Sequence, residues 1–339
     1  MPEVILHRVG PGVTVQDQGR QGYLAQGLSR GGAADLLAMA EGAALLGQDP
    51  SLAAIEIAGS FLTLEVTAPT RIAVTGARMR ARCDGSELTW NASHALPAGA
   101  MLELGAPVGG YSYLHFGGGV SSEAALGARS AHLAAGILRM LEAGTRLALG
   151  EDSGNRTGLT FTPEARFDGG ALRLVKTPQS HLFSDCQLQR FTSTIFHKDA
   201  RGNRMGQRLV CDEADFKLEA GLRILSETIV PGDIQITGDG APFVLLAECQ
   251  TTGGYPRIGT VLPCDLPRLV QAPATVALRF EFVTLEEAVA LERDAASRRA
   301  DLPKQLRPLI RDPHDIQDLL AYQLIGGVSC GDELERTTR

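Results

Sequence analysis

Short alternating segments constrain the fold of the first half of the chain most strongly. Between residues 55 and 104, apolar and polar residues alternate over short runs, of which Phe61–Val66 is a clear example. Asp84-Gly85 is a dipeptide typical of a tight β-hairpin turn. Regularly spaced short strands with turn residues between them predict a β-sandwich or a β-barrel. The predicted strands of this region are residues 61–66, 71–75, 79–83, 88–90 and 100–104.

A helix is predicted near residues 33–46, which are rich in Ala and Leu. Asp35 lies in its first turn and Gly47 follows its end, as is typical of helix boundaries. Residues 150–170 are instead rich in Gly, Thr, Asp and Pro, a composition typical of a linker. We therefore expect an N-terminal β-rich domain over residues 1–165 that contains one helix.

The second half is also predicted to be β-rich, up to residue 285. From there on apolar residues follow a helical spacing, and Asp312-Pro313 predicts the start of a further helix. We expect a second β domain over residues 166–285 and a helical extension over residues 286–339 that ends in a loose polar tail. The predicted strands of the second domain include residues 171–175, 191–196 and 242–247.

The composition excludes several classes of partner. The chain has 339 residues and a net charge of −7, and no Lys/Arg cluster is interleaved with aromatic residues, so we expect no nucleic-acid partner. There is no apolar run that would suit a membrane span or a signal peptide, so we expect a cytoplasmic protein without a membrane partner. The six cysteines lie far apart and none forms a Cys-x-x-Cys pair, which indicates free thiols and no metal site.

A polar loop with two glycines is the leading candidate for a binding site. It follows the apolar run at residues 242–247 and reads Gln250-Thr251-Thr252-Gly253-Gly254-Tyr255. An amide and two hydroxyls thus lie just beyond a strand end, and the glycines let the backbone approach a ligand closely. The tyrosine adds a flat face with a hydroxyl. The same sequence also suits a hairpin with a polar tip, so both interpretations stay open.

Three arginines and an asparagine surround two glycines between residues 201 and 209. Arginine forks bind carboxylates and phosphates, so Asn203, Arg204 and Arg208 are candidate anion-binding residues. The alternative interpretation is a solvated, charged turn. Gln235 lies on a predicted strand after a Pro-Gly turn, and it points away from its isoleucine neighbours. Its amide is therefore either exposed or part of a site.

Two further features favour structural roles. Gly27-Leu28-Ser29-Arg30-Gly31 matches the G-x-S-x-G pattern of a serine nucleophile, but the polar segment before it does not predict the strand that such an elbow requires. Ser29 is therefore expected to be a helix-entry residue. His115 is flanked by aromatic residues and is expected to be a hydrogen-bonded strand histidine. The chain also lacks both glycine-rich fingerprints of phosphate-binding loops.

Several runs in combination carry a resemblance to a known family. The most specific are Gln16-Asp17-Gln18-Gly19-Arg20 and the Gln-Thr-Thr-Gly-Gly-Tyr-Pro run at residues 250–256. In these runs the chain resembles the carboxyltransferase-like family known as allophanate hydrolase subunit 2, which includes the C subunit of 5-oxoprolinase and KipA-type proteins. The family usually has Ser where this chain has Ala128, and often where it has Gly202, which affects the details of the site. The other matching runs are residues 113–119, 127–130, 203–206 and 231–235.

The resemblance implies a mainly β fold with a few helices, in two β-rich halves, of which the C-terminal one is a cyclophilin-like β-barrel. It also implies one component of a hydrolase that opens 5-oxo-L-proline to L-glutamate with ATP hydrolysis and that is inactive without its partners. The implied partners are a protein of the subunit-1 or B type and a protein of the A type. The implied cofactor is ATP with Mg, at a site shared with a partner.

The implied substrate site draws on both halves of the chain. Arg204 or Arg208 would hold a carboxylate or a phosphate, and the amides and hydroxyls would bind the lactam. The candidate substrate-binding residues are Gln16, Arg20, Asn203, Arg204, Arg208, Gln235, Gln250, Thr251, Thr252, Gly253, Gly254 and Tyr255. The catalytic candidates are Asp17, Gln235, Gln250, Thr252 and Tyr255, with His115 by its chemistry alone. None of them stands out as a general base.

Two other functions stay open. The first is the carboxyltransferase component of a biotin-dependent urea or guanidine carboxylase. Its biotin would arrive on another polypeptide, because this chain has no Met-Lys-Met acceptor. The second is a non-enzymatic regulatory module of the KipA type, which needs no chemistry in its pocket.

Overall fold

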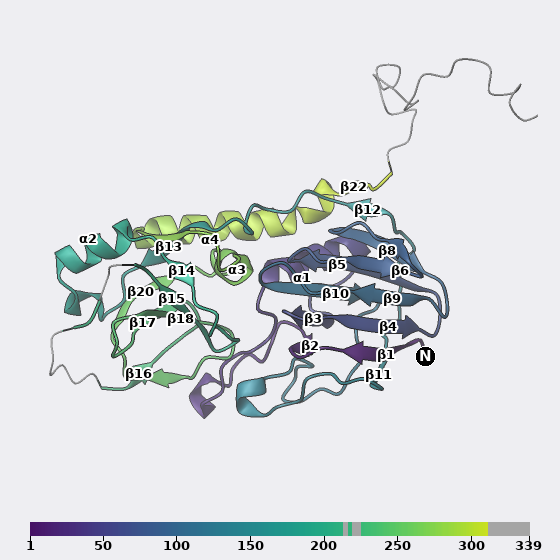
Figure 1. The fold of residues 1–339 in the computed structure, drawn as a ribbon, viewed down its shortest axis with the longest axis horizontal. Helices are drawn as coiled ribbons and strands as arrows, with labels where there is room; N and C mark the ends of the chain where they lie inside the picture. Colours follow the sequence, from purple (N-terminus) through teal and green to yellow (C-terminus); the bar gives the residue numbers. More distant parts are fainter. Residues whose placement is uncertain (213–215, 219–224, 311–339) are drawn as a thin grey trace, which may run out of the picture.

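The computed structural model describes residues 1–212, 216–218 and 225–310. These residues form two β-rich halves that lie side by side (Figure 1). Two large sheets make up the first half, and a third large sheet makes up the second half beside a small two-stranded one. The mainly β fold expected from the sequence is confirmed. The further helix expected at Asp312 and the loose tail lie outside the described residues.

The first half packs two antiparallel sheets around one aliphatic core. Fully buried side chains from both sheets, among them Leu6, Ile57 and Leu64, meet in this core. The first sheet has the order β11-β1-β4-β9-β6-β7, with the bounds Arg146–Ala148, Glu3–Val9, Leu62–Val66, Met101–Leu104, Ala81–Cys83 and Ser86–Glu87. The second has the order β2-β3-β10-β5-β8-β12-β22, with the bounds Val13–Gln16, Ala54–Ala58, Tyr111–Phe116, Thr70–Gly76, Ala92–Leu96, Leu159–Thr160 and Arg307–Pro308.

The hairpin between β6 and β7 confirms one local prediction, and the segment after it corrects another. Cys83 pairs with Ser86 across Asp84-Gly85, whose φ angles are 47° and 83°. The strand predicted over residues 88–90 is wrong, because this segment connects β7 of the first sheet to β8 of the second. The Trp90 indole N–H donates there to the carbonyl oxygen of Gly76 at 3.1 Å. A half-buried indole N–H usually has such a partner.

α1 (Leu36–Leu46) is the helix predicted near residues 33–46, and the residues that flank it explain where it begins and ends. The Asp35 carboxylate accepts hydrogen bonds from the first-turn N–H groups of Leu37 and Ala38. Gly47 ends the helix with a φ of 63°, which glycine adopts without strain. The helix packs against β5 and β10 of the first half.

The third sheet curls around a core that is rich in phenylalanine (Figure 1). Its strands pair in an antiparallel manner except for β13 and β21, which run parallel. The sheet has the order β14-β15-β18-β17-β20-β13-β21, with the bounds His197–Lys198, Gly206–Val210, Pro242–Leu245, Asp233–Ile236, Arg257–Val261, Gly170–Val175 and Leu278–Phe282. The small sheet pairs β16 (Glu227–Thr228) with β19 (Thr252–Gly253).

The strand predicted over residues 191–196 is wrong, because the first half of this segment belongs to the end of a helix. α2 (Asp185–Ser193) begins with a capping box in which Ser184 and Gln187 satisfy each other's backbone N–H groups. Phe191 is fully buried on the apolar face of this helix. The Ser-x-x-Gln start therefore outweighs the strand propensity of the Phe and Thr residues that follow it.

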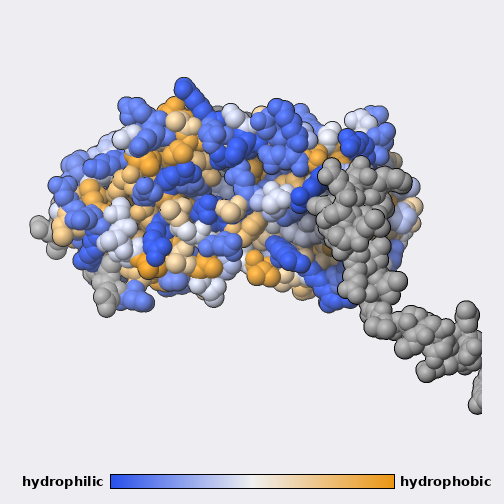
Figure 2. Space-filling model, turned by 90° about the horizontal axis from the view of Figure 1, so that it is seen from above, coloured by the Kyte–Doolittle hydropathy of each residue, from blue (hydrophilic) through white to orange (hydrophobic). Residues whose placement is uncertain are grey.

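The end of the described chain ties the two halves together. α4 (Leu285–Ala300) contacts β13 in the second half and α1 in the first (Figure 1). β22 then joins the second sheet by pairing with β12. Figure 2 shows this face of the molecule, where hydrophilic residues are interspersed with apolar ones. The remaining helices are α3 (Leu266–Gln271) and the 3-10 turns η1 (Leu24–Gln26), η2 (Leu133–Ala135), η3 (Ser180–Leu182) and η4 (Leu302–Gln305).

A buried ion network also joins the halves. The Arg166 guanidinium donates to both Glu41 carboxylate oxygens, at 2.7 and 2.6 Å, and to Asp35 at 3.0 Å. Gln271 of α3 donates to the same Asp35 carboxylate at 2.7 Å. Burial raises the pKa of Glu41 to about 7, and the paired guanidinium of Arg166 opposes this shift. The start of α1 is thus fixed against the second half.

Within the described part of the chain, every helix is too short or too polar to cross a bilayer.

Candidate functional site

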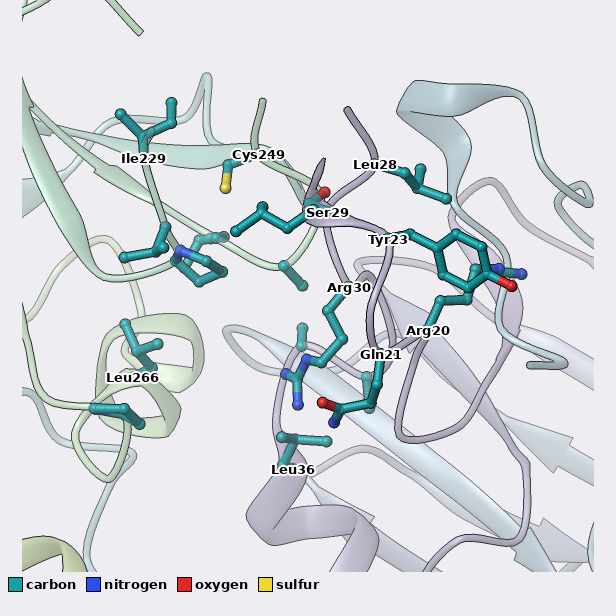
Figure 3. A pocket seen from close by; sticks show the side chains of 18 of the residues that line it. Arg20, Gln21, Tyr23, Leu28, Ser29, Arg30, Leu36, Ile229, Cys249 and Leu266 are labelled. Carbon is teal, nitrogen blue, oxygen red and sulfur yellow. The ribbon is translucent and has the colours of Figure 1, made fainter. Parts of the chain in front are cut away.

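A cavity of about 430 Å³ lies between the two halves (Figure 3). The first half supplies one wall, from the loop that follows β2 to the start of α1. The second half supplies the other wall, from the segments before β17 and after β18 and from the start of α3. Ligand sites are common at such domain interfaces. The lining residues fall in the ranges 20–36, 229–231, 246–249 and 263–267.

The cavity wall is largely apolar and carries no carboxylate. Leu36, Ile229 and Leu266 provide apolar surface from both halves. Among the described residues that line the cavity, the only charged ones are Arg20 and Arg30, and none is Asp or Glu. In a chain whose net charge is −7, such a wall favours an anionic ligand over a cationic one.

Arg20 is a predicted binding residue that does line the cavity, but its donors are already used. Its Nε donates to the carbonyl oxygen of Ala125 at 3.0 Å. Its two terminal nitrogens donate to the hydroxyl and the carbonyl oxygen of Ser130, at 3.2 and 2.5 Å. Burial lowers the pKa of this guanidinium, against the nearby charge of Asp17. Arg20 therefore holds two loops of the first half together.

Arg30 lines the same cavity, but its guanidinium, unlike that of Arg20, has no hydrogen-bond partner in the described part of the chain. Among the described residues, none accepts a hydrogen bond from its guanidinium or forms an ion pair with it. Figure 3 shows its side chain reaching between Gln21 and Leu36 on the side that faces Leu266. Burial lowers its pKa, and no opposing charge offsets that shift.

Ser29 is the first member of a short chain of side chains that continues through a histidine to a glutamate. Its Oγ lies 2.9 Å from Nε2 of His132, and Nδ1 of His132 lies 3.8 Å from Oε2 of Glu248. All three side chains are buried. Burial also lowers the pKa of His132, against the nearby Glu248 carboxylate, which favours the neutral imidazole.

The hydrogen bonds around His132 argue against an activated serine. The Ala135 N–H donates to Nδ1 at 3.2 Å, so the imidazole proton is on Nε2 and points at Ser29. Glu248 instead accepts the N–H of Ala134 at 3.0 Å. A nucleophilic serine needs the opposite tautomer. The segment before Ser29 is the turn η1 and not a strand, which confirms that no nucleophile elbow is present.

Ser29 was also expected to enter a helix, and this expectation is wrong. α1 begins only at Leu36, and Asp35 caps it. The physical reason is that Asp35 offers a carboxylate to two N–H groups, whereas the Ser29 hydroxyl is engaged with His132.

The Gln-Thr-Thr-Gly-Gly-Tyr-Pro loop lies at the surface, just outside the cavity. Gln250, Thr252, Gly254 and Tyr255 are exposed, and Thr251 and Gly253 are partly buried. None of these residues lines the cavity, although their neighbour Cys249 does. The small β16–β19 sheet holds the loop in place. Its exposed amide and hydroxyl groups are therefore free to contact another molecule.

Gln235 lies beneath that loop. Its side chain is buried, and its Nε2 has no hydrogen-bond partner among the described residues. A Cβ placed on Gly253 would lie 2.3 Å from this nitrogen, so the glycine lets the loop backbone rest on the amide. Of the predicted residues, Gln235 and Gly253 are thus brought into contact.

Gln16 and Asp17 occupy structural positions in the first half. Gln16 is fully buried, and its amide donates to the Thr14 hydroxyl at 3.0 Å and to the Ala131 carbonyl oxygen at 3.2 Å. Asp17 accepts hydrogen bonds from the backbone N–H groups of Gly19 and Arg129. Neither of them lines the cavity.

Arg204 joins the halves and does not face the cavity. Its guanidinium donates to Glu56 of the first half, to Glu248 of the second and to the carbonyl oxygen of Gly32. The opposed Glu56 and Glu248 charges hold its pKa above the usual range, although burial acts the other way. All three of these side chains are buried. With its donors engaged in this way, Arg204 acts as an interdomain clamp.

Arg208 and Asn203 are engaged locally in the second half. Arg208 forms an ion pair with Asp239 at 2.6 Å and lies 3.5 Å from Asp199. The exposed Asn203 accepts the N–H of Met205 at 2.8 Å. These contacts agree with the alternative interpretation of this segment as a charged turn. His115, as expected, is a buried strand histidine, with its Nε2 2.9 Å from the Thr75 hydroxyl.

Sequence patterns give little indication of which residues line the cavity. Arg30 belongs to the Gly27–Gly31 segment, whose resemblance to a serine-nucleophile pattern assigns no role to the arginine. One signal is present: a long, polar, glycine-rich loop with two arginines between β2 and α1. Loops of that kind are more often functional than those that merely connect elements. The apolar wall from Leu266 could not be placed beside this loop without the fold.

Two curated proteins, each named as the C subunit of 5-oxoprolinase, are similar to the chain. The one from Escherichia coli strain K12 is 32% identical over 292 residues, which cover 85% of this chain and 93% of that protein. The one from Haemophilus influenzae is 32% identical over 285 residues, 83% of this chain and 91% of that protein. The family model described as carboxyltransferase domain, subdomain A and B, matches residues 26–282. The chain belongs to this carboxyltransferase family.

Solved structures show how this carboxyltransferase fold is used in longer chains. The crystal structure of TTHA0988 is 29% identical, with a TM-score of 0.75 over 83% of this chain and 55% of that one. The Kluyveromyces lactis urea carboxylase is 21% identical, with a TM-score of 0.77 over 92% of this chain and 31% of that one. The chain thus spans about half of TTHA0988 and less than a third of the urea carboxylase.

Proposed function

We propose that this carboxyltransferase-family chain is the C subunit of an ATP-dependent 5-oxoprolinase, a hydrolase that opens 5-oxo-L-proline to L-glutamate. The observation that carries the proposal is the 32% identity to two proteins that bear the name of this component, over more than nine-tenths of each. Agreement over almost the whole length of both proteins supports a shared role and not only a shared domain.

The interdomain cavity fits the substrate of such an enzyme. Its volume of about 430 Å³ admits a small ring compound, and its wall combines apolar surface with arginine. 5-Oxoproline is a five-membered lactam with a carboxylate, so it needs contacts of both kinds. The absence of acidic residues among the described lining residues removes a source of repulsion.

The reaction requires more than this chain offers. A lactam carbonyl is a poor electrophile, and ATP supplies the activation that lets water attack it. The chain has no glycine-rich phosphate-binding fingerprint, so we place ATP and its Mg at a site shared with a partner. The exposed loop at residues 250–255 lies close to the cavity wall and is suited to contact that partner. We accordingly propose A-type and B-type partner proteins and no turnover by the chain alone.

A second candidate function is the carboxyltransferase step of a biotin-dependent urea or guanidine carboxylase. The family description itself favours it, since the matching domain is named for carboxyl transfer. Biotin would then be carried by another polypeptide. A non-enzymatic, KipA-type regulatory module is the third candidate, and it predicts that no turnover accompanies binding.

The test is glutamate formation from 5-oxoproline and ATP by this chain purified together with its A-type and B-type partners. We expect glutamate only when all three proteins are present, and none from any single protein or pair. Biotin- and bicarbonate-dependent ATP consumption with urea or guanidine, without glutamate, would replace the proposal by the carboxylase. If neither assay shows turnover, the regulatory module remains as the candidate function.

A further inference from the structure

The interdomain cavity contains a positive charge that the protein does not neutralise. Arg30 has no acceptor among the described residues, and no Asp or Glu lines the cavity that it enters. Two other arginines of the described interior meet carboxylates: Arg166 meets Glu41 and Asp35, and Arg204 meets Glu56 and Glu248. Arg30 differs from both, at a place where both halves leave room for a ligand.

A partly buried guanidinium without an acceptor is costly, because it loses water without gaining hydrogen bonds. A ligand with a planar anionic group would supply the hydrogen-bond acceptors that this guanidinium lacks. The guanidinium presents its N–H donors in a fork that matches two carboxylate oxygens. The fork would also match a phosphate, but the apolar wall beside it favours a carboxylate carried on a small organic molecule.

Arg20, the other arginine of the cavity, cannot take this role. Its Nε and both terminal nitrogens already donate to Ala125 and Ser130 within the first half. Moving it toward a ligand would break three hydrogen bonds. The Arg30 guanidinium donates to none of the residues that the structure describes, and Figure 3 shows it extending into the space between Gln21, Leu36 and Leu266. One arginine is therefore structural and the other is available to a ligand.

We propose that Arg30 is the residue that binds the substrate carboxylate, with the apolar walls at Leu36, Ile229 and Leu266 facing the hydrocarbon part of the same molecule. In naming 5-oxoproline as that molecule, the inference rests on the proposed function. In assigning a small carboxylic acid to the cavity, it rests on the structure alone. Arg30 then decides specificity, because a neutral amide offers its guanidinium one uncharged acceptor oxygen, whereas a carboxylate offers two charged ones.

Binding to the purified chain tests the carboxylate assignment without the partners. Calorimetric titration compares 5-oxoproline with 5-oxoprolinamide, its neutral amide, and with inorganic phosphate. We expect 5-oxoproline to bind the wild type more tightly than the amide by about 10- to 100-fold, the range for a charged hydrogen-bonded pair. Arg30→Met should lose that preference, and Arg30→Lys should keep part of it, because lysine keeps the charge but not the fork.

The control variant is Arg139→Met, which removes an exposed arginine that does not line the cavity. It should bind as the wild type does, and thermal melts of all variants should confirm that they are folded. An Arg30→Met chain that still prefers 5-oxoproline to its amide would overturn the proposal. So would a wild type that binds neither 5-oxoproline nor any simple carboxylate, or one that binds phosphate in preference to them.

The assembled complex separates failure of this inference from failure of the proposed function. If the wild-type complex forms glutamate, Arg30→Met should raise the KM for 5-oxoproline by about 10- to 100-fold. An unchanged KM would reject Arg30 and leave the 5-oxoprolinase assignment standing. If the wild-type complex forms no glutamate, the proposed function fails, and the titration still decides whether Arg30 holds a carboxylate.

Discussion

Arg204 and Arg208 show how far a residue's role depends on partners distant in sequence. Both stand in one short charged segment, and the sequence offers them equally as anion-binding residues. In the fold, Arg204 is buried between Glu56 and Glu248 of opposite halves, whereas Arg208 pairs with Asp239, whose side chain is 55% exposed. The Arg204 partners lie far from it in the chain, so spacing alone could not distinguish the two arginines.

Replacing each arginine by methionine should therefore have very different effects on stability. Arg204→Met leaves two buried carboxylates without their partner and should lower the free energy of unfolding by about 3–5 kcal/mol. Arg208→Met removes a pair with an exposed partner and should cost less than about 1 kcal/mol. Urea denaturation of both variants beside the wild type measures the difference. Equal losses would show that Arg204 is not an interdomain clamp.

At the scale of elements, most of the strands predicted from the sequence are present, and the errors have local causes. The segment at 88–90 connects two sheets and places the Trp90 indole N–H against the Gly76 carbonyl, and α2 forms because Ser184 and Gln187 cap its start. The packing of α1 on β10 depends on a contact that no pattern shows. Gly42 of the helix lies against the ring of His115, where a Cβ would come within 2.2 Å.

This packing keeps His115 neutral and makes stability depend on pH. Burial lowers its pKa from 6.5 to about 3. Below pH 6.5 the unfolded chain takes up a proton that the folded chain refuses, so stability falls as the pH falls toward 3. The contribution lost at pH 5 relative to pH 7 is about 2 kcal/mol.

His115→Gln should remove this part of the acid sensitivity. Urea denaturation at pH 7 and pH 5 gives the loss for each protein, and the variant's loss should be smaller by about 2 kcal/mol. Measurements at pH 7 and pH 8 serve as the control, since His115 is mostly neutral there even in the unfolded chain, and the two proteins should behave nearly alike. An equal loss in both proteins between pH 7 and pH 5 would contradict the account.

At the scale of the whole molecule, the candidate site exists only because the two halves meet. Arg30 reaches the cavity from the first half, and Val230 and Leu266 face it from the second. The sequence pointed to the loop at residues 250–255, which lies beside the cavity but at the surface. The fold class could be predicted from local patterns, whereas a cavity between distant segments depends on how the halves pack. Filling that cavity should abolish substrate turnover without disturbing either core.

The most direct measurement is the rate of glutamate formation by the three-protein complex with a blocked cavity. Val230 lines the cavity and is 39% exposed, so Val230→Trp can place its ring in the space without displacing a core residue. Val108→Trp is the matched control, since Val108 is 71% exposed and does not line the cavity. We expect the wild type and Val108→Trp to form glutamate, and the rate of the Val230→Trp complex to fall to that of a complex without this chain. Full activity of a folded, assembled Val230→Trp complex would show that the substrate binds elsewhere.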